Sequence, residues 1–419
     1  MSILIKHVNV FDGKHSEILR DRNIVIEGEL VKEIIAGEVS EENFDEVIDG
    51  KGNYAIPGLT DAHVHLGRLM APGAGHELGI IVSTLVSRKL LNHGITTVRD
   101  AGGITVGLKE AIDEGIIDGP RIYPSNAYIS QTCGHGDSEY AHNTRDIQYK
   151  TITHVALADG PAEIQRAVRE QLYKGASQIK LMAGGGMSST CDPVETLQFS
   201  EEELRAAVNA AADYGTYVMA HLYTSNCVQR AVKAGIKSLE HAHAMDEETV
   251  KMVADAGVFV DPCPQFTEAE VKWSHMGPYS DYPQPVKKKP KRGGQNVIAQ
   301  TARTTDLINK YDVKILFGTD MMIMYPGYEP RQSLDITEYK KRFGSFKGLL
   351  SATGNVNDLI KLTTYQNPYP EGEIGVLKEG SYADIVITKG NPVEDLDVLG
   401  NTDNLLLVMK AAKVYKNIL

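Results

Sequence analysis

The sequence is poor in the features that mark secreted, membrane-embedded and nucleic-acid-binding proteins. Its 419 residues include one tryptophan and four cysteines, and no apolar stretch is long enough to span a membrane. The N-terminal residues MSILIKHVNVFDGK lack the apolar core of a signal peptide. The absence of paired cysteine spacing favours reduced thiols packed in the core or in loops over a disulfide framework; the cysteines are Cys133, Cys191, Cys227 and Cys263. We therefore expect a cytoplasmic protein that has no membrane partner.

Positive charge is scarce as well. The chain has 43 lysines and arginines against 55 aspartates and glutamates, which gives a formal net charge of -12. Because phosphate binding needs a basic surface, this balance argues against a nucleic-acid partner and favours small molecules or peptides. One basic cluster lies within residues 274–294, which we interpret as a solvated loop and helix start and as a candidate lid. It consists of Lys287, Lys288, Lys289, Lys291 and Arg292.

Short stretches of alternating apolar residues at both ends of the chain predict β-strands. They include ILIKHVNVFDG and NIVIEGELVKEIIAG near the start, and GSYADIVITKGNP and NLLLVMKAAKVYKN near the end. Alternation with a period of two is typical of strands with one buried face. We expect these strands to form one small β-sandwich domain from residues 1–57 and 366–419.

Between the ends, apolar runs of strand length alternate with helical stretches. SEEELRAAVNAAADYG is typical of a helix, because Ser200 can cap its N-terminus and Glu203 can complete a capping box. Counting the strand that carries His63, eight candidate strands alternate with helices, which predicts an α/β fold, a (β/α)8 barrel, over residues 58–365. The other candidate strands lie in GITTVRDAG, PRIYPSNAYIS, ASQIKLMAGGG, TYVMAHLYT, IKSLEHAHA, GVFVDPCP and VKILFGTDMM.

The stretch GLTDAHVHLG at residues 58–67 places two histidines one residue apart. Side chains on a strand alternate between its faces, so His63 and His65 are expected to project to the same side. This geometry suits two ligands of one cation but does not require one, because an isolated His-x-His motif also occurs by chance. Further ligands must therefore come from other strands.

Four more polar residues fall at the ends of predicted strands, where the functional residues of a barrel gather. Alone, each has an ordinary explanation: a histidine can be a hydrogen-bonded core residue, a lysine can pair with a carboxylate, and an aspartate can cap a helix. Together with the two histidines of the first strand, they predict a binuclear metal site at the barrel mouth. The four are Lys180, His221, His241 and Asp320.

The residues around these positions resemble the amidohydrolase superfamily of metal-dependent hydrolases. The resemblance rests on AIPGLTDAHVHL, LFGTD and IGVLKEGSYADIVITKGNP, and it covers nearly the whole length. In that superfamily a lysine reacts with CO2 and the resulting carbamate bridges two divalent cations; imidazole and carboxylate ligands suit Zn2+. The resemblance implies that His63, His65 and Asp320 bind one cation, that His221 and His241 bind the other, and that the carbamate on Lys180 spans both.

The resemblance also implies a role in proton transfer. Asp320 would act as the proton shuttle, which accepts a proton during attack by hydroxide and passes one to the leaving amine. The stretch HAH at residues 241–243 offers two candidate ligands. His241 is preferred because it directly follows the strand IKSLE and matches the family's Glu-His position, which leaves His243 behind the ligands.

Two further stretches are similar to a subgroup of prolidase-like dipeptidases to which an ochratoxin-type amidase also belongs. They are QTCGHGD, which contains His135, and HLY, which contains Tyr223. In the subgroup, the corresponding histidine and tyrosine contact the substrate around the scissile carbonyl. Cys133 stands where the subgroup has glycine, so the sequence departs from the pattern there. The glycines of MAGGGMSS, after Lys180, either supply flexible backbone beside the site or only form a tight loop.

We therefore predict a homo-oligomeric, metal-dependent hydrolase that acts on the amide bond of dipeptides or N-acyl amino acids. One alternative is a cyclic-amide hydrolase or deaminase, such as an imidazolonepropionase-like enzyme. The deaminase branch generally uses one metal and lacks the bridging lysine, so Lys180 favours amide hydrolysis. A second alternative is a non-catalytic assembly protein on the same fold, against which the retention of all six metal-site residues argues.

Overall fold

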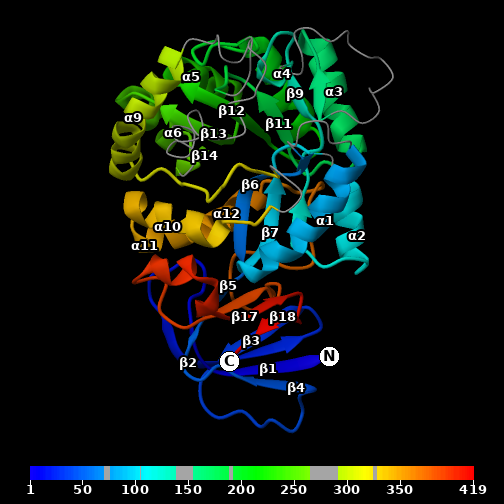
Figure 1. Cartoon of the computed structure of the whole chain (residues 1–419), viewed down its shortest axis with the longest axis vertical. Coiled ribbons are helices and arrows are strands. Elements are labelled where there is room, and N and C mark those ends of the chain that lie inside the picture. The colour runs from blue at the N-terminus through cyan, green and yellow to red at the C-terminus, as the bar shows by residue number, and fades with distance from the viewer. Residues whose placement is uncertain (70–75, 104, 138–153, 188–191, 265–290, 324–327) are drawn as a thin grey trace.

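The computed structural model of the chain describes residues 1–69, 76–103, 105–137, 154–187, 192–264, 291–323 and 328–419. Its strands form three sheets, of eight, six and four strands. In Figure 1 the eight-stranded sheet lies below, and the two smaller sheets with their helices lie above it. Within the described residues, no helix combines the length and the apolar character needed to cross a membrane.

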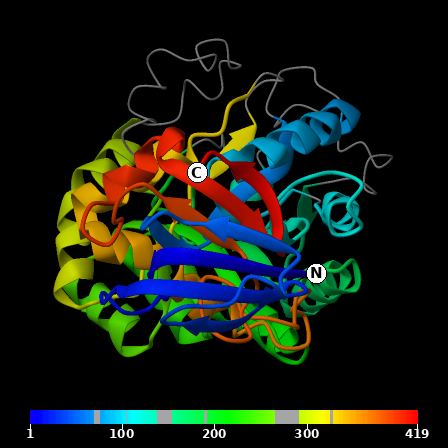
Figure 2. The same cartoon turned by 90° about the horizontal axis from the view of Figure 1, so that it is seen from below.

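The eight-stranded sheet joins the two ends of the chain. Its order is β18-β17-β16-β5-β1-β2-β3, and β4 pairs with β1. Because β5 pairs with both β1 and β16, late strands complete a sheet begun by early ones (Figure 2). The sequence predicts a β-sandwich here, whereas the structure has one continuous hydrogen-bonded sheet. Its strands are β1 (Ser2–Val10), β2 (Leu19–Glu27), β3 (Leu30–Ile35), β4 (Glu46–Asp49), β5 (Tyr54–Pro57), β16 (Ile385–Thr388), β17 (Leu405–Lys410) and β18 (Lys413–Asn417).

At the central strand β16 both faces of this sheet are buried, because apolar side chains point to both sides. On β16, Ile385 and Ile387 pack with Ile3 and Ile5 of β1 in a core of the sheet's own. The intervening Val386 packs into the main core of the molecule. Successive side chains of a strand point to opposite faces. One face of the sheet therefore packs in the sheet's own core, and the other packs against the main core of the molecule.

The paired strands of the two smaller sheets run parallel. Parallel neighbours need crossover connections, which here contain helices. One sheet has β9 (Tyr128–Ser130), β10 (Val155–Leu157), β11 (Ile179–Met182), β12 (Val218–Thr224), β13 (Ser238–Ala244) and β14 (Phe259–Asp261). The other has β6 (Leu59–Leu69), β7 (Ile95–Asp100), β8 (Arg121–Tyr123) and β15 (Met321–Ile323).

Backbone hydrogen bonds connect the two parallel sheets at both seams. At one seam, the Leu316 N–H donates to the carbonyl of Val260 at 2.8 Å, and the Ala62 N–H donates to a neighbouring carbonyl, that of Phe317, at 2.7 Å. At the other, the Ser177 N–H, just before β11, donates to the carbonyl of Pro124, which directly follows β8, at 2.7 Å. These bonds hold the sheets edge to edge.

Three strands differ from the sequence prediction. PRIYPSNAYIS is expected as one strand but forms β8 and β9, which belong to different sheets; between them Asn126 adopts a left-handed φ of 58°. VKILFGTDMM is expected as one strand, yet it contains an isolated bridge between Ile315 and Val260, followed by the short β15. The sequence pattern does not predict β10.

Helices connect the parallel strands, and the predicted capping box at Ser200 and Glu203 is present at the start of α4. Of the candidate lid, only residues 291–294 are described, as the first turn of α9; Lys287, Lys288 and Lys289 lie outside the described residues. The helices are α1 (His76–Asn92), α2 (Val106–Asp113), α3 (Pro161–Tyr173), α4 (Glu201–Ala212), α5 (Ser225–Ala234), α6 (Glu247–Asp255), α9 (Lys291–Lys310), α10 (Gln332–Phe343), α11 (Ser345–Ser351) and α12 (Gly354–Ile360), with 3-10 turns η1 (His135–Asp137), η4 (Leu396–Gly400) and η5 (Thr402–Asn404).

Candidate metal centre

Strand β6 carries two buried histidines to one side of its sheet. His63 and His65 project together, with ring centroids 5.3 Å apart, while Val64 between them packs into the main core. Burial lowers the pKa of His63 to about 4. Its ring is therefore neutral at pH 7 and keeps a lone pair that a cation can use.

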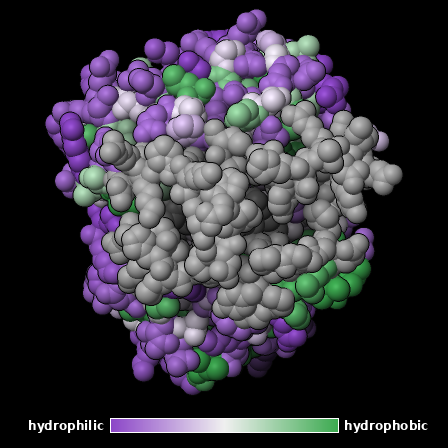
Figure 3. All heavy atoms as spheres, turned by 45° about the horizontal axis from the view of Figure 1, so that its top comes forward, coloured by the Kyte–Doolittle hydropathy of each residue, from purple (hydrophilic) through white to green (hydrophobic). Residues whose placement is uncertain are grey.

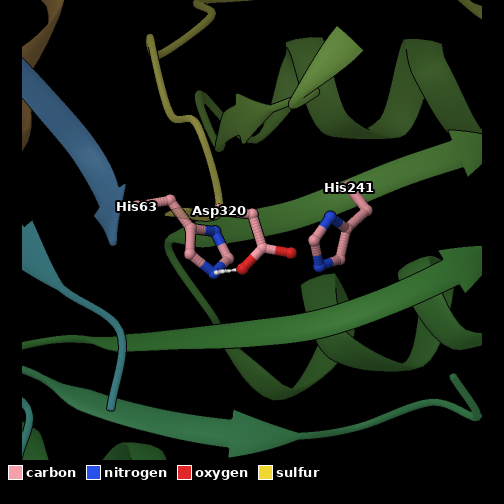
Figure 4. A group of neighbouring side chains, drawn as sticks. All are labelled: His63, His241 and Asp320. Atoms are coloured by element: carbon pink, nitrogen blue, oxygen red, sulfur yellow. Dashed lines mark ion pairs between the residues drawn. The ribbon is translucent and has the colours of Figure 1, made fainter. Parts of the chain in front are cut away.

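The loop between Phe317 and β15 brings a carboxylate to these rings. Oδ1 of Asp320 lies 3.4 Å from Nε2 of His63 (Figure 4) and 3.1 Å from Nε2 of His65. Asp320 has a φ of 50°, a left-handed conformation that is uncommon outside glycine. Burial acts to raise the pKa of Asp320, but the imidazoles of His63 and His65 lower it below its ordinary value. Asp320 therefore supplies a negative charge.

A second buried carboxylate, Asp61, supports this loop from below. It accepts hydrogen bonds from the Thr319 hydroxyl at 2.6 Å and from Nε2 of Gln332 at 3.1 Å. It also accepts from the backbone N–H groups of Thr319 and His63, at 3.1 and 3.2 Å. Asp61 thus ties the residue before Asp320 to the strand that carries His63.

Lys180 in β11 is buried with its amine beside this cluster. Its Nζ lies 3.2 Å from Nε2 of His63. Burial lowers the pKa of Lys180, and this effect outweighs the opposing negative charges of Glu240 and Asp320. A lowered pKa increases the fraction of neutral amine, which is the nucleophilic form of lysine.

The other two predicted ligands come from the neighbouring strands β12 and β13. His221 and His241 pack in a T-shaped arrangement with ring centroids 4.8 Å apart, and the ring of His241 lies 5.4 Å from that of His63. Figure 4 shows Asp320 between His63 and His241. Tyr223 stacks on His241 at 5.1 Å and 16°. Burial lowers the pKa of His221 and of His241 well below the ordinary value, so both rings are neutral at pH 7.

The second histidine of the HAH stretch has a different partner. Nε2 of His243 lies 2.5 Å from the carbonyl oxygen of Pro262, which requires a proton on Nε2. His241 instead groups with His63 and Asp320, whose ligand atoms all lie within 4.8 Å of one another. The geometry therefore favours His241 as the ligand, as the sequence does.

The turn η1 places His135 against the same cluster. Its ring stacks on that of His221, with centroids 4.2 Å apart and planes 5° from parallel. Its Nδ1 lies 3.3 Å from Oδ2 of the buried Asp192. Cys133, just before this turn, has a φ of 59°, a conformation that glycine adopts most readily. The loop therefore keeps a glycine-like backbone at the position where the subgroup pattern has glycine.

A buried ion pair that the sequence does not predict lies behind His63. Arg99 in β7 donates to both carboxylate oxygens of Glu240 in β13, each at 3.1 Å. Although burial acts to raise it, the charge of Arg99 lowers the pKa of Glu240 to about 2. Oε2 of Glu240 lies 2.8 Å from Nδ1 of His63, which places the proton on Nδ1 and leaves Nε2 for the cluster. The only sequence signals are charged residues inside buried strands.

The donors at this cluster fit divalent cations. The candidate imidazoles with lowered pKa are neutral, and Asp320 is ionised, which is the state in which these groups bind metal. Nitrogen and oxygen ligands at about 2.0–2.2 Å from one ion suit zinc. The ligand atoms of His63, His241 and Asp320 lie within 4.8 Å of one another.

A second group of neighbouring donors fits a cation poorly. It consists of His63, Asp261 and Cys263. Burial raises the pKa of Asp261 and of Cys263 well above their ordinary values, which disfavours the deprotonated forms that bind a cation. Nδ1 of His63 already pairs with Glu240. These properties make the second group less suited to a cation, so the first group is the candidate centre.

Comparisons with known proteins agree with this chemistry. The model of the Amidohydrolase family matches residues 54–415. An ochratoxinase from Aspergillus niger is 29% identical over 380 residues, which cover 86% of this chain and 75% of the relative. The fold is similar to a prolidase complexed with N-methylphosphonate-L-proline, with 30% identity, a TM-score of 0.88 and 100% coverage of both chains. It is also similar to a Xaa-Pro dipeptidase with methionine bound in its active site, with 29% identity, a TM-score of 0.86 and 100% coverage of both.

Proposed function

Because the chain belongs to the amidohydrolase family and is a metal-dependent amidohydrolase, we propose that it hydrolyses the amide bond of dipeptides or N-acyl amino acids. The observation that carries this proposal is the packing of His135 and Tyr223 on the buried histidines His221 and His241. The buried amine of Lys180 lies beside the same cluster. The similarity to a prolidase, a Xaa-Pro dipeptidase and an ochratoxinase supports the substrate class.

The proposed cofactor is a pair of divalent cations, with zinc as the metal. His63, His65 and Asp320 would hold one ion, His221 and His241 the other, and a carbamate on Lys180 would lie between the two. The lowered pKa of Lys180 supports carbamate formation, because only a neutral amine can react with CO2. When bound, such cations acidify water toward hydroxide and polarise a carbonyl oxygen.

The chain's own residues would supply proton transfer and orientation. Asp320 is ionised and in contact with His63 and His65, so its carboxylate is placed to accept a proton and pass it to the leaving amine. The Tyr223 hydroxyl would donate to the carbonyl oxygen as negative charge develops there. His135 would contact the substrate from the side of His221. Burial of the whole cluster strengthens each of these interactions.

The proposal is tested by offering a library of L-Xaa-L-Xaa dipeptides and N-acyl amino acids to the purified protein, with its metal content measured in parallel. The expected products are an acid and an amine from the cleaved amide bond. Ammonia release from a ring amine, much faster than any dipeptide cleavage, would instead support the deaminase alternative. A metal-free protein that takes up no divalent cation would support the assembly-protein alternative.

Replacing Tyr223 with phenylalanine should lower kcat by about 10- to 1,000-fold, the scale of losing one donor to a developing oxyanion. Metal content should stay unchanged, because the ring that stacks on His241 is kept. Steady-state kinetics on the best dipeptide measure the loss. Tyr123→Phe is the matched control: Tyr123 is buried and donates to Asn367 at 3.2 Å, away from the centre, so it should leave kcat unchanged. Equal kcat for Tyr223→Phe and wild type would remove Tyr223 from the mechanism.

We also propose that the two parallel sheets act as one (β/α)8 barrel over residues 58–365, with residues 1–57 and 366–419 as the small β-domain. The seam hydrogen bonds and the shared eight-stranded sheet support this division. Seams that lie apart in a crystal structure would contradict it. The cytoplasmic location rests on the sequence pattern and is tested by fractionation.

A homo-oligomer is the last part of the proposal. Helix α1 exposes Leu78, Ile80, Ile81 and Leu85. Figure 3 shows apolar side chains gathered at the right-hand edge, the side on which α1 lies in Figure 1. Contiguous exposed apolar side chains mark interaction surfaces. Light scattering that gives the mass of a single chain would contradict this proposal.

A further inference from the structure

The segment between β11 and α4 holds His135 at two points. Oδ2 of Asp192 lies 3.3 Å from Nδ1 of His135. The same oxygen accepts hydrogen bonds from the Gly186 N–H at 2.9 Å and from Nε2 of Gln198 at 3.1 Å. Oε1 of Gln198 accepts the backbone N–H of His135 at 2.8 Å. The segment that follows the strand of Lys180 thus fixes both the ring and the backbone of His135.

Gly186 leaves room for the ring of His135 because glycine has no side chain. A Cβ at this position would lie 1.7 Å from Cε1 and 1.9 Å from Nδ1 of His135. Gly186 is not among the glycines with a positive φ, so its backbone would accept another residue. The ring of His135, and not the chain conformation, therefore requires glycine here. Gly185 differs, because a Cβ there would meet the backbone carbonyl of Pro193 at 1.8 Å.

We propose that Asp192 and Gly186 are positioning residues for His135, which set the orientation of its ring over His221. Asp192 is 2% exposed, and its carboxylate, 3.3 Å from Nδ1, favours a proton on that nitrogen over Nε2. The carboxylate of Asp192 and the open space over Gly186 hold the ring in its parallel stack at 4.2 Å.

This inference rests on the proposed function in one respect: it treats His135 as the group that contacts the substrate. The segment would then act on turnover only through His135. In a purely structural role, by contrast, Asp192 would affect turnover because it connects Gly186 to Gln198. That effect would be the same whatever residue occupies position 135.

The test is a double-mutant cycle on the metal-loaded full chain. Asp192→Asn and Gly186→Ala are each expected to lower kcat/KM for the best dipeptide by about 10- to 100-fold, the usual cost of losing a partner that orients a functional group. Metal content should stay unchanged. In a His135→Ala background each change should alter kcat/KM by less than about twofold, because both act through a ring that is no longer present. Equal losses in both backgrounds would overturn the inference.

Two control variants distinguish an effect on the His135 ring from a general loss of structure. Gly107→Ala in α2 is matched to Gly186→Ala, because a Cβ at Gly107 meets nothing within 4 Å; it should leave kcat/KM unchanged. Leu197→Ala shortens a side chain that is 39% exposed in the same segment, and it should also leave kcat/KM unchanged. A loss with Leu197→Ala equal to that with Asp192→Asn would assign the effect to the fold of the segment.

A spectroscopic measurement separates this inference from the proposed function. In the metal-free protein labelled with 15N-histidine, the Nδ1–H signal of His135 is identified by its absence from His135→Ala. It should be present in the wild type and be lost or shifted in Asp192→Asn. If His135→Ala cleaves dipeptides as well as the wild type does, the substrate role of His135 fails, while the Nδ1–H signal still decides whether Asp192 orients the ring. An Nδ1–H signal unchanged in Asp192→Asn contradicts the inference.

Discussion

Replacing Lys180 with alanine is expected to deplete the metal centre and to abolish amide hydrolysis. Nζ of Lys180 lies 3.2 Å from Nε2 of His63, and the proposed carbamate is the one ligand shared by both cations. Losing a residue that only supports a ligand costs about 10- to 100-fold in metal affinity or activity, so losing the shared ligand should cost at least about 100-fold. Metal content per chain and kcat on the best dipeptide measure both effects.

The matched control is Lys410→Ala. Lys410 is also buried, but it lies in β17 of the eight-stranded sheet and donates to the Gly119 carbonyl at 2.7 Å. Its loss should lower thermal stability and leave the metal content unchanged. Reloading the metal-free wild type in CO2-free buffer should also give a lower metal content than reloading with bicarbonate. A Lys180→Ala protein that keeps two metals and full activity would contradict the assignment of the site.

Asp320→Asn should lower kcat by about 100- to 10,000-fold even at saturating metal, the range for losing a general acid–base group. Asparagine keeps the shape of the side chain and an oxygen ligand, but it cannot take up and release a proton. The contacts of Oδ1 with His63 and His65 can persist, so the variant should fold. Single-turnover kinetics with saturating metal separate the chemical step from metal loss.

Asp246→Asn serves as the control for this substitution. Asp246 caps the N-terminus of α6 by accepting from the Thr249 N–H at 2.9 Å, and asparagine is an equally good cap. Its turnover and stability should match the wild type. If Asp320→Asn at saturating metal stayed within tenfold of the wild-type kcat, another group would have to carry the proton.

The strands that deliver the site could be predicted because their signals are local. The apolar stretches around His63, Lys180, His221 and His241 form β6, β11, β12 and β13. Each polar residue interrupts an apolar run and lies inside its strand rather than at the end that the sequence predicts, and the strands that neighbour one another in a sheet pair in parallel. Periodicity and strand order therefore sufficed to gather these residues.

The backbone around Asp320 could not be predicted in the same way. VKILFGTDMM has the composition of a strand, yet the backbone of Asp320 is in the left-handed conformation. The position of Asp320 is fixed by the neighbouring Thr319, whose N–H and hydroxyl donate to Asp61. Those bonds join residues far apart in the sequence. A local pattern carries no information about them, so the expected strand is an isolated bridge and the three-residue β15.

The supporting charges were missed for a related reason. Arg99 and Glu240 are charged residues inside buried strands, and only their mutual contact explains why both are buried. The roles that we propose for Asp192 and Gly186 likewise become visible only from their contacts with the ring of His135. The strand pattern therefore predicts the residues nearest the proposed cations. The residues that orient those ligands can be recognised only from tertiary contacts.

The pairing of β5 with β16 has a consequence for synthesis on the ribosome. Residues 54–57 emerge long before residues 385–388, with which they form hydrogen bonds. At about 5–20 residues per second, the delay lasts on the order of tens of seconds. During this time the edge of β5 is open to strands of other nascent chains, which favours aggregation. A chain terminated before Ile385 would carry all the proposed metal ligands and still lack the strand that closes this edge.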